Sequence, residues 1–291
     1  ASVDAADSDA VDRALEIAHG LFRDRDRWLS VAARIDVLRE TARRMEAQAE
    51  HLAVEAAREG GKPLVDSRVE VARAIDGVVS CAELLRGEAG HVIPMNLNAA
   101  SLGRIAFTQR EPVGVVVAVS AFNHPLNLIV HQVAPAIAAG CPVIVKPAED
   151  TPLSCFRFVE ILRAAGLPDS WCQALLTESR EVTGQLVTDP RMGFFSFIGS
   201  AAVGWSLRGR LAPGTRCALE HGGAAPVIVA ADADLAQAVP ALVKGGFYHA
   251  GQVCVSVQRI FAHRSIAAEL ATRLAEHAKT LRVGDPLLPE T

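Results

Sequence analysis

The sequence predicts an α/β fold in which a parallel, Rossmann-like sheet carries helices on both faces. Apolar stretches such as Gly114 to Val119 and Pro142 to Lys146 have the length of buried strands. Amphipathic helical segments alternate with them, and strands buried on both faces are typical of parallel sheets. Sheets of this kind bind ligands beyond the carboxyl ends of their strands, so we expect the functional site there.

The composition excludes several classes of protein. The 291 residues are 50% hydrophobic and 21% charged, and the formal net charge of −4 predicts no nucleic-acid partner. No apolar run reaches the roughly 18 to 20 residues of a membrane span, and the acidic N-terminus is unlike a signal peptide, so we expect no membrane partner and a cytoplasmic location. The six cysteines form no CxxC pair or zinc-like cluster, so we expect reduced thiols and no metal.

Residues 1–90 are predicted to be mainly helical. Apolar residues recur at steps of three and four from Trp28 to Leu52, and Gly60-Gly61 ends this helix. A further helix begins near Pro63, and we expect its inward face to consist of Val65, Val69, Ala72, Ile75 and Val79. Between 91 and 111 the helical period is lost and 104–108 alternates like a strand, which indicates an excursion from the main body.

From Pro112 onward strands and helices alternate. A helix is predicted from about Pro125 to Gly140, and further strands at 171–176, 194–197 and 226–229. Thr151-Pro152 is a strong helix start, because threonine can cap a helix and proline suits its first turn.

Three residues beside strand ends or glycines could carry catalysis. Cys254 follows Gly251, Glu220 precedes Gly222-Gly223, and Asn123 comes directly after the strand 114–119. Taken alone, they are more often a buried thiol, a capping or solvated acid and a turn asparagine. The functional alternatives are a nucleophile, a general base and an amide donor in an oxyanion hole.

Four further residues could hold a dinucleotide. Lys146 ends a buried strand and Glu149 follows it, so they could bind ribose hydroxyls, although a strand-end lysine often only reaches solvent. Gly199-Ser200 precedes a helix whose free N–H groups suit a pyrophosphate. No GxGxxG follows a strand, and Gly199 to Gly204 is not followed by Lys-Ser/Thr, so neither an ordinary Rossmann fingerprint nor a P-loop is present.

The order and spacing of these motifs resemble the aldehyde dehydrogenase superfamily. The matching stretches are EPVGVVVAVSAFNHPLNL, VIVKPAEDTP, FSFIGSAAVG, LEHGGAAPVIV and GQVCVSVQRI, and the resemblance runs to VGDP near residue 284. Glu220 and Cys254 lie 34 residues apart, as the family shows. The resemblance implies an NAD-binding domain (1–90 and 112–221), an oligomerisation segment (91–111) and an incomplete catalytic domain (222–291).

The resemblance also implies a role for each candidate. Cys254 would be the nucleophile and Glu220 the base, while the Asn123 side chain and the Cys254 backbone N–H would form the oxyanion hole. Lys146 and Glu149 would bind the adenosine ribose, and Gly199 and Ser200 would lie near the pyrophosphate. Phe122, where the family often has Trp, would lie at the cofactor site. The implied reaction is oxidation of a small aldehyde through a thiohemiacetal and a thioester, in a homodimer or homotetramer.

Some positions depart from the family, and three alternatives stay open. His124, Ile198 and His221 replace a frequent Phe, Thr and Leu, and a packed or solvated His221 is expected. Family members continue well past residue 291, so we expect a partial chain.

The alternatives to hydrolysis are a CoA-acylating enzyme, against which Glu220 argues, and an inactive nucleotide-binding relative. NAD is expected as the cofactor, with NADP possible, because the Glu149 carboxylate repels a 2′-phosphate.

Overall fold

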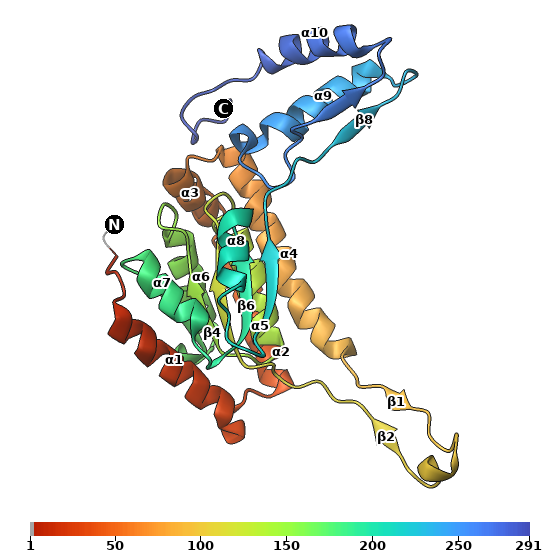
Figure 1. Ribbon diagram of the computed structural model, residues 1–291. Helices are drawn as coiled ribbons and strands as arrows, with labels where there is room; N and C mark the ends of the chain where they lie inside the picture. The colour runs from red at the N-terminus through yellow and green to blue at the C-terminus, as the bar shows by residue number, and fades with distance from the viewer. Residues whose placement is uncertain (1–2) are drawn as a thin grey trace.

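The computed structural model, which describes residues 3–291, has a five-stranded sheet at its centre (Figure 1). The strand order is β5–β4–β3–β6–β7, and every neighbouring pair is parallel. The strands are β3 (Val115–Val119), β4 (Val143–Lys146), β5 (Cys172–Ala174), β6 (Met192–Ile198) and β7 (Arg216–Glu220). The predicted parallel sheet is confirmed.

Helices cover both faces of this sheet. One core lies under α2 (Val31–Ala47), α3 (Ala49–Gly60), α4 (Leu64–Gly87), α5 (Asn127–Ala138) and α6 (Leu153–Ala164). The opposite core lies under α1 (Ser8–Arg23), α7 (Arg180–Thr188) and α8 (Ala201–Arg208). In β3, Val116 and Ala118 enter the first core, and Val115 and Val117 enter the second. Burial on both faces explains why the sequence of this strand is continuously apolar.

The side on which the chain adds strands to the sheet switches between β3 and β6. The chain adds β4 and β5 on one side of β3 and then returns to add β6 and β7 on the other. The helices that follow β3 and β6 cover opposite faces, so a crevice opens between the carboxyl ends of these two strands. Gln132 of α5 joins them there, because its Nε2 atom donates to the carbonyl oxygens of Val119 (3.2 Å) and Ser196 (3.0 Å).

Two parts extend from the sheet (Figure 1). The first is the antiparallel pair β1 (Val92–Ile93) and β2 (Ala106–Phe107), which lies at the end of a long arm. The second has its own core and consists of the parallel strands β8 (Val227–Val229) and β9 (Ile260–Ala262), with α9 (Leu235–Phe247) between them and α10 (Ala267–Ala278) after them. Gly222 and Gly223 lie in the connection from β7 to this second unit.

Two of the helical predictions are wrong. The long helix predicted through Leu52 is two helices, α2 and α3, because Gln48 leaves the helical conformation at φ −124° and ψ 23°. In α4, Val65 and Val69 are 51% and 50% exposed rather than inward. The buried residues of α4 are Leu64, Ser67, Glu70, Val71, Ala74, Val78 and Ala82. The helix is turned toward Glu70 because this acid is neutralised in the interior by a lysine, a pairing that apolar periodicity does not register.

Candidate active site

A cavity of about 1420 Å³ lies at the carboxyl ends of β3, β6 and β7. Its wall also includes the segment before β9 and parts of α4 and α5. The predicted site residues that line it are Cys254, Glu220, Asn123, Phe122, Gly199 and Ser200. The three groups predicted to be catalytic therefore face one common space, although they come from distant parts of the chain.

A strained turn precedes Cys254. His249, Ala250 and Gly251 adopt left-handed backbone conformations with φ of 47°, 54° and 75°. For the two residues with a Cβ this conformation costs roughly 1–2 kcal/mol each, so the surroundings must hold it. His249 is buried, and the hydroxyl of Ser256 donates to the carbonyl of Gly251 at 3.0 Å. The turn places Cys254 in an exposed position on the cavity wall.

The segment that carries Glu220 runs beside the segment that carries Cys254. Glu220 is the last residue of β7, and its carbonyl accepts a hydrogen bond from the N–H of Gly199 at 3.0 Å. A Cβ at Gly223 would lie 3.3 Å from the carbonyl oxygen of Cys254, so the glycine permits a close approach. The N–H of Gln258 donates to the carbonyl of Ala224 at 3.1 Å and continues the pairing.

Asn123 contacts the Cys254 loop directly. Its Nδ2 atom donates a hydrogen bond to the carbonyl of Gln252 at 2.7 Å. Its Oδ1 atom is buried and has no hydrogen-bond partner among residues 3–291. An amide nitrogen carries two hydrogens, so one remains to donate to an oxyanion near Cys254.

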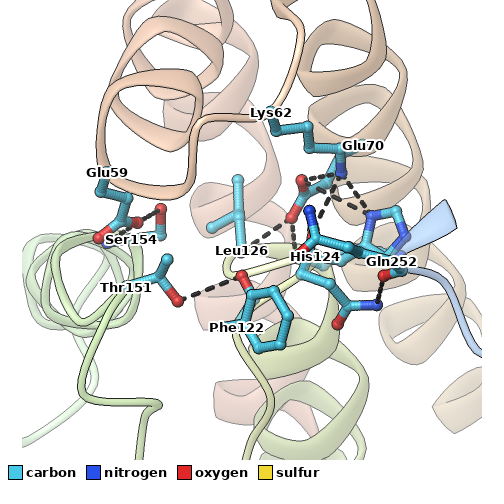
Figure 2. Close-up of polar contacts among 11 residues, drawn as sticks. Glu59, Lys62, Glu70, Phe122, His124, Leu126, Thr151, Ser154 and Gln252 are labelled. Carbon is cyan, nitrogen blue, oxygen red and sulfur yellow. Dashed lines mark hydrogen bonds and ion pairs between the residues drawn. The ribbon is translucent and has the colours of Figure 1, made fainter. Parts of the chain in front are cut away.

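A buried ion pair supports the loop that follows β3 (Figure 2). The Nζ atom of Lys62 lies 2.6 Å from Oε2 of Glu70, and the two side chains are 1% and 0% exposed. Lys62 also lies 2.5 Å from Nδ1 of His124 and donates to the carbonyl of Asn123 at 3.4 Å. The other oxygen of Glu70 accepts the N–H groups of Leu126 and Asn127 at 2.9 and 3.0 Å, at the start of α5.

These contacts keep Glu70 ionised. Burial acts to raise the pKa of Glu70, but the hydrogen bond and the charge of Lys62, together with the Asn127 N–H, lower it. Burial lowers the pKa of Lys62, although the charge of Glu70 opposes this. Because an ionised acid in the interior requires a cation, we take Lys62 as the ammonium ion.

A second acid fixes the start of α6, which Thr151 joins to the loop after β3 (Figure 2). Glu59 of α3 accepts the N–H groups of Leu153 and Ser154 at 2.7 and 2.9 Å, and burial raises its pKa. Glu59 therefore caps α6, and the expected Thr151 cap is wrong. The hydroxyl of Thr151 instead donates to the carbonyl of Phe122 at 3.2 Å.

The cavity wall near β6 is the N-terminus of α8. The Ser200 hydroxyl caps this helix by accepting the N–H of Val203 at 3.4 Å. Gly199 leaves room for the ring of Phe197, since a Cβ there would lie 2.7 Å from it. His221 packs edge-on against Trp205, with ring centroids 5.5 Å apart, and its Nε2 atom is buried. His221 is therefore a packed histidine, as expected.

Lys146 and Glu149 lie at the margin of the site. Neither charged residue lines the cavity, although Ala148, which lies between them in the sequence, does. Their side chains form an ion pair of 3.4 Å, in which Lys146 is buried and Glu149 is 69% exposed. The structure thus does not bring this pair together with Cys254, Glu220 and Asn123.

Several residues of the site were missed in the sequence. Lys62, Glu70 and His249 are buried behind the cavity, and Arg73 of α4 lines it. The available signal was a lysine directly after Gly60-Gly61, with an acid two helical turns later. Across residues 3–291 no group of three or more His, Cys, Asp or Glu side chains could hold a metal ion. In the same residues no helix combines the length and apolarity that crossing a membrane requires.

Comparisons with known proteins place this geometry in context. The model of the aldehyde dehydrogenase family matches residues 1–291. A 3-sulfolactaldehyde dehydrogenase from Priestia aryabhattai is 35% identical over 100% of this chain and 60% of its own length. The crystal structure of glyceraldehyde-3-phosphate dehydrogenase GapN from Methanocaldococcus jannaschii, complexed with NADP, is 35% identical with a TM-score of 0.93 and covers 100% of this chain and 63% of that one. The crystal structure of an NAD-dependent aldehyde dehydrogenase from Sinorhizobium meliloti is 33% identical with a TM-score of 0.92, and it covers 99% of this chain and 57% of that one. The chain thus spans about 60% of the length of the curated relative.

Proposed function

Because the chain belongs to the aldehyde dehydrogenase family, we propose that it oxidises an aldehyde to a carboxylic acid with NAD(P), using Cys254 as the nucleophile. The observation that carries this proposal is the single cavity lined by Cys254, Glu220 and Asn123. The similar structures include one complexed with NADP and one named as NAD-dependent. Two of the similar proteins are named for aldehydes that also carry a sulfonate or a phosphate group.

The cavity fits a dinucleotide at the β3–β6 crevice. The free N–H groups at the start of α8 face the same space as Gly199, and a helix N-terminus favours a phosphate. The nicotinamide, when bound, accepts a hydride from the substrate. We propose that Gly199 and Ser200 contact the pyrophosphate, with Phe122 on the opposite wall of the crevice.

The side chains of this protein divide the remaining work. The thiolate of Cys254 adds to the aldehyde carbonyl and forms a thiohemiacetal. The Asn123 amide and the Cys254 backbone N–H stabilise the oxyanion, and one such donor lowers a barrier by about 2.7–4 kcal/mol. Loss of hydride leaves a thioester on Cys254. Glu220 takes a proton from water, which attacks the thioester and releases the acid.

Transient kinetics on the full-length protein test this proposal. Cys254→Ala is expected to abolish NADH formation. Glu220→Gln should still produce a rapid burst of NADH, because only hydrolysis requires the base, followed by slow turnover. Cys217→Ala is a matched control, since this thiol lies in β7 outside the cavity wall. Normal turnover by Cys254→Ala, or acyl-CoA rather than free acid as the product, would contradict the proposed reaction.

We also propose that the β1–β2 arm mediates self-association into a homodimer or homotetramer. The arm exposes apolar side chains far from any core, with Ile105 at 88% and Phe107 at 71%. A short two-stranded pair with an apolar surface gains stability when another surface covers it. A second copy of the chain is the proposed cover. The cytoplasmic location stays a prediction.

A further inference from the structure

The cavity has a cationic end beside α4. Its charged lining residues are Arg73, Arg180 and Glu220. Arg73 lies one turn of α4 beyond Glu70 and has no ion-pair partner among the residues that the structure describes. An exposed guanidinium directed at a binding cavity without a carboxylate partner is available to an anionic ligand.

His124 contributes a hydrogen-bond donor to the same end. Its Nδ1 atom lies 2.5 Å from the Nζ atom of Lys62, and an ammonium group has only donors, so Nδ1 must accept. A neutral imidazole then carries its hydrogen on Nε2. The Nε2 atom makes no hydrogen bond to residues 3–291, and the side chain lines the cavity. The buried Lys62–Glu70 pair thus sets the tautomer that presents an N–H group to a ligand.

Two more side chains of α5 make this wall polar. The Oδ1 atom of Asn127 is buried without a partner within residues 3–291, and Asn127 lines the cavity. His131 lies one turn further along α5, close to Gly77, which lets α4 and α5 approach. Burial lowers the pKa of His131, and the positive charge of Arg73 lowers it further, whereas Glu220 opposes this. Arg73 and Glu220 therefore both act on one imidazole, which indicates that the cationic end lies near the predicted base.

We propose that the substrate is an aldehyde with an anionic group at its other end, and that the Arg73 guanidinium and the His124 Nε2–H bind that group. This inference rests on the proposed aldehyde oxidation. A carboxylate, sulfonate or phosphate oxygen can accept from both donors, whereas a purely apolar aldehyde would leave the Arg73 charge unpaired.

A matched pair of substrates tests the proposal on the full-length protein. Succinic semialdehyde and butanal have the same number of carbon atoms, but only the first carries a carboxylate. The wild-type ratio of their kcat/KM values should favour succinic semialdehyde. Arg73→Ala should lower that ratio about 10- to 100-fold, the worth of a hydrogen bond to a charged group, and His124→Phe should lower it in the same direction. Arg86→Ala, on the same helix but outside the cavity wall, should leave it unchanged.

A second measurement does not depend on oxidation. Succinate should protect Cys254 from iodoacetamide better than butyrate does, and Arg73→Ala should remove the difference, with thermal unfolding confirming that the variant is folded. If both the ratio and the protection survive Arg73→Ala, the anion site is overturned and aldehyde oxidation stands. If succinate protects through Arg73 but no aldehyde is oxidised, the anion site stands and the proposed reaction is overturned. If neither oxidation nor protection occurs, both are overturned.

Discussion

The Asn123 amide donates to the carbonyl of Gln252, two residues before Cys254, across 129 positions of sequence. The hydrogen bond ties the loop after β3 to the loop of the proposed nucleophile. A substitution of Asn123 can therefore have two effects: it can displace the loop of Cys254, and it can remove a donor that stabilises an oxyanion.

The first prediction concerns this amide. Asn123→Ala should lower kcat about 10²- to 10³-fold, because one oxyanion donor is lost. Stopped-flow NADH formation measures the effect on the hydride step. Asn96→Ala, in the distant arm, serves as a control. A kcat for Asn123→Ala within a few-fold of the wild type would show that the amide only holds the loop.

The second prediction concerns the buried ion pair. Lys62→Met should lower the free energy of unfolding by about 3–5 kcal/mol, because it leaves the Glu70 charge buried without a counterion. The double variant Lys62→Met/Glu70→Met should recover most of this loss. Arg68→Met removes an exposed pair with Glu50 and should cost about 0–1 kcal/mol. Urea unfolding measures all three, and equal losses for Lys62→Met and Arg68→Met would contradict the prediction.

The third prediction concerns pH. Burial lowers the pKa of His249 to about 4, with the charge of Lys62 acting in the same direction. An unfolded histidine titrates near 6.5, so between these values the unfolded chain binds a proton that the native state does not. Stability should therefore fall as pH falls through this window, by at most about 1.4 kcal/mol per unit.

The variant His249→Gln isolates that contribution. Urea unfolding at pH 7 and pH 5 should show a smaller loss of stability in the variant than in the wild type. His263→Gln, at an exposed position, should keep the wild-type slope. An unchanged slope in His249→Gln would mean that other groups cause the acid sensitivity.

The fourth prediction concerns the cofactor. We expect NAD to be preferred, because the exposed Glu149 carboxylate repels a 2′-phosphate. Glu149→Gln removes this charge and releases Lys146 from their ion pair, so the NADP/NAD ratio of kcat/KM should rise about 10-fold, as expected for one partly screened charge. Glu160→Gln, on α6, should leave the ratio unchanged. Equal or better turnover of the wild type with NADP would refute the preference.

The fifth prediction concerns the arm. Ile105→Lys and Phe107→Lys should weaken self-association more than 10-fold, because each apolar side chain contributes about 1.5–3 kcal/mol when buried. Light scattering over a dilution series gives the assembly mass. Val31→Lys, an exposed apolar position on α2, is the control. Unchanged association in both arm variants would place the interface elsewhere.

The central sheet could be predicted because the burial of its strands leaves a pattern within short stretches of sequence. β3 and β4 are buried on both faces, so all their residues except the terminal Lys146 are apolar, and this pattern is visible without the rest of the chain. Glu220 and Cys254 were harder, because a single acid or thiol fits an ordinary role and only their joint spacing pointed to chemistry.

The supporting residues could not be predicted for the opposite reason. Lys62 and Glu70 are polar residues in the core, and their burial is possible only because each neutralises the other. Neither residue alone indicates this, and the apolar stripe of Val65 and Val69 pointed to the wrong face of α4. The position of Gln48 between α2 and α3 likewise depends on tertiary packing rather than on propensity.

Glu220 is the last residue of the edge strand β7, whereas Cys254 belongs to the unit built around β8 and β9. Gly222-Gly223 lies in the connection between the sheet and this unit. The acid and the sulfur are thus carried by two different structural units, and their separation depends on how the segment after β7 packs against the segment of Cys254. We therefore expect mutations that disturb this packing to slow thioester hydrolysis even when every reacting group is intact.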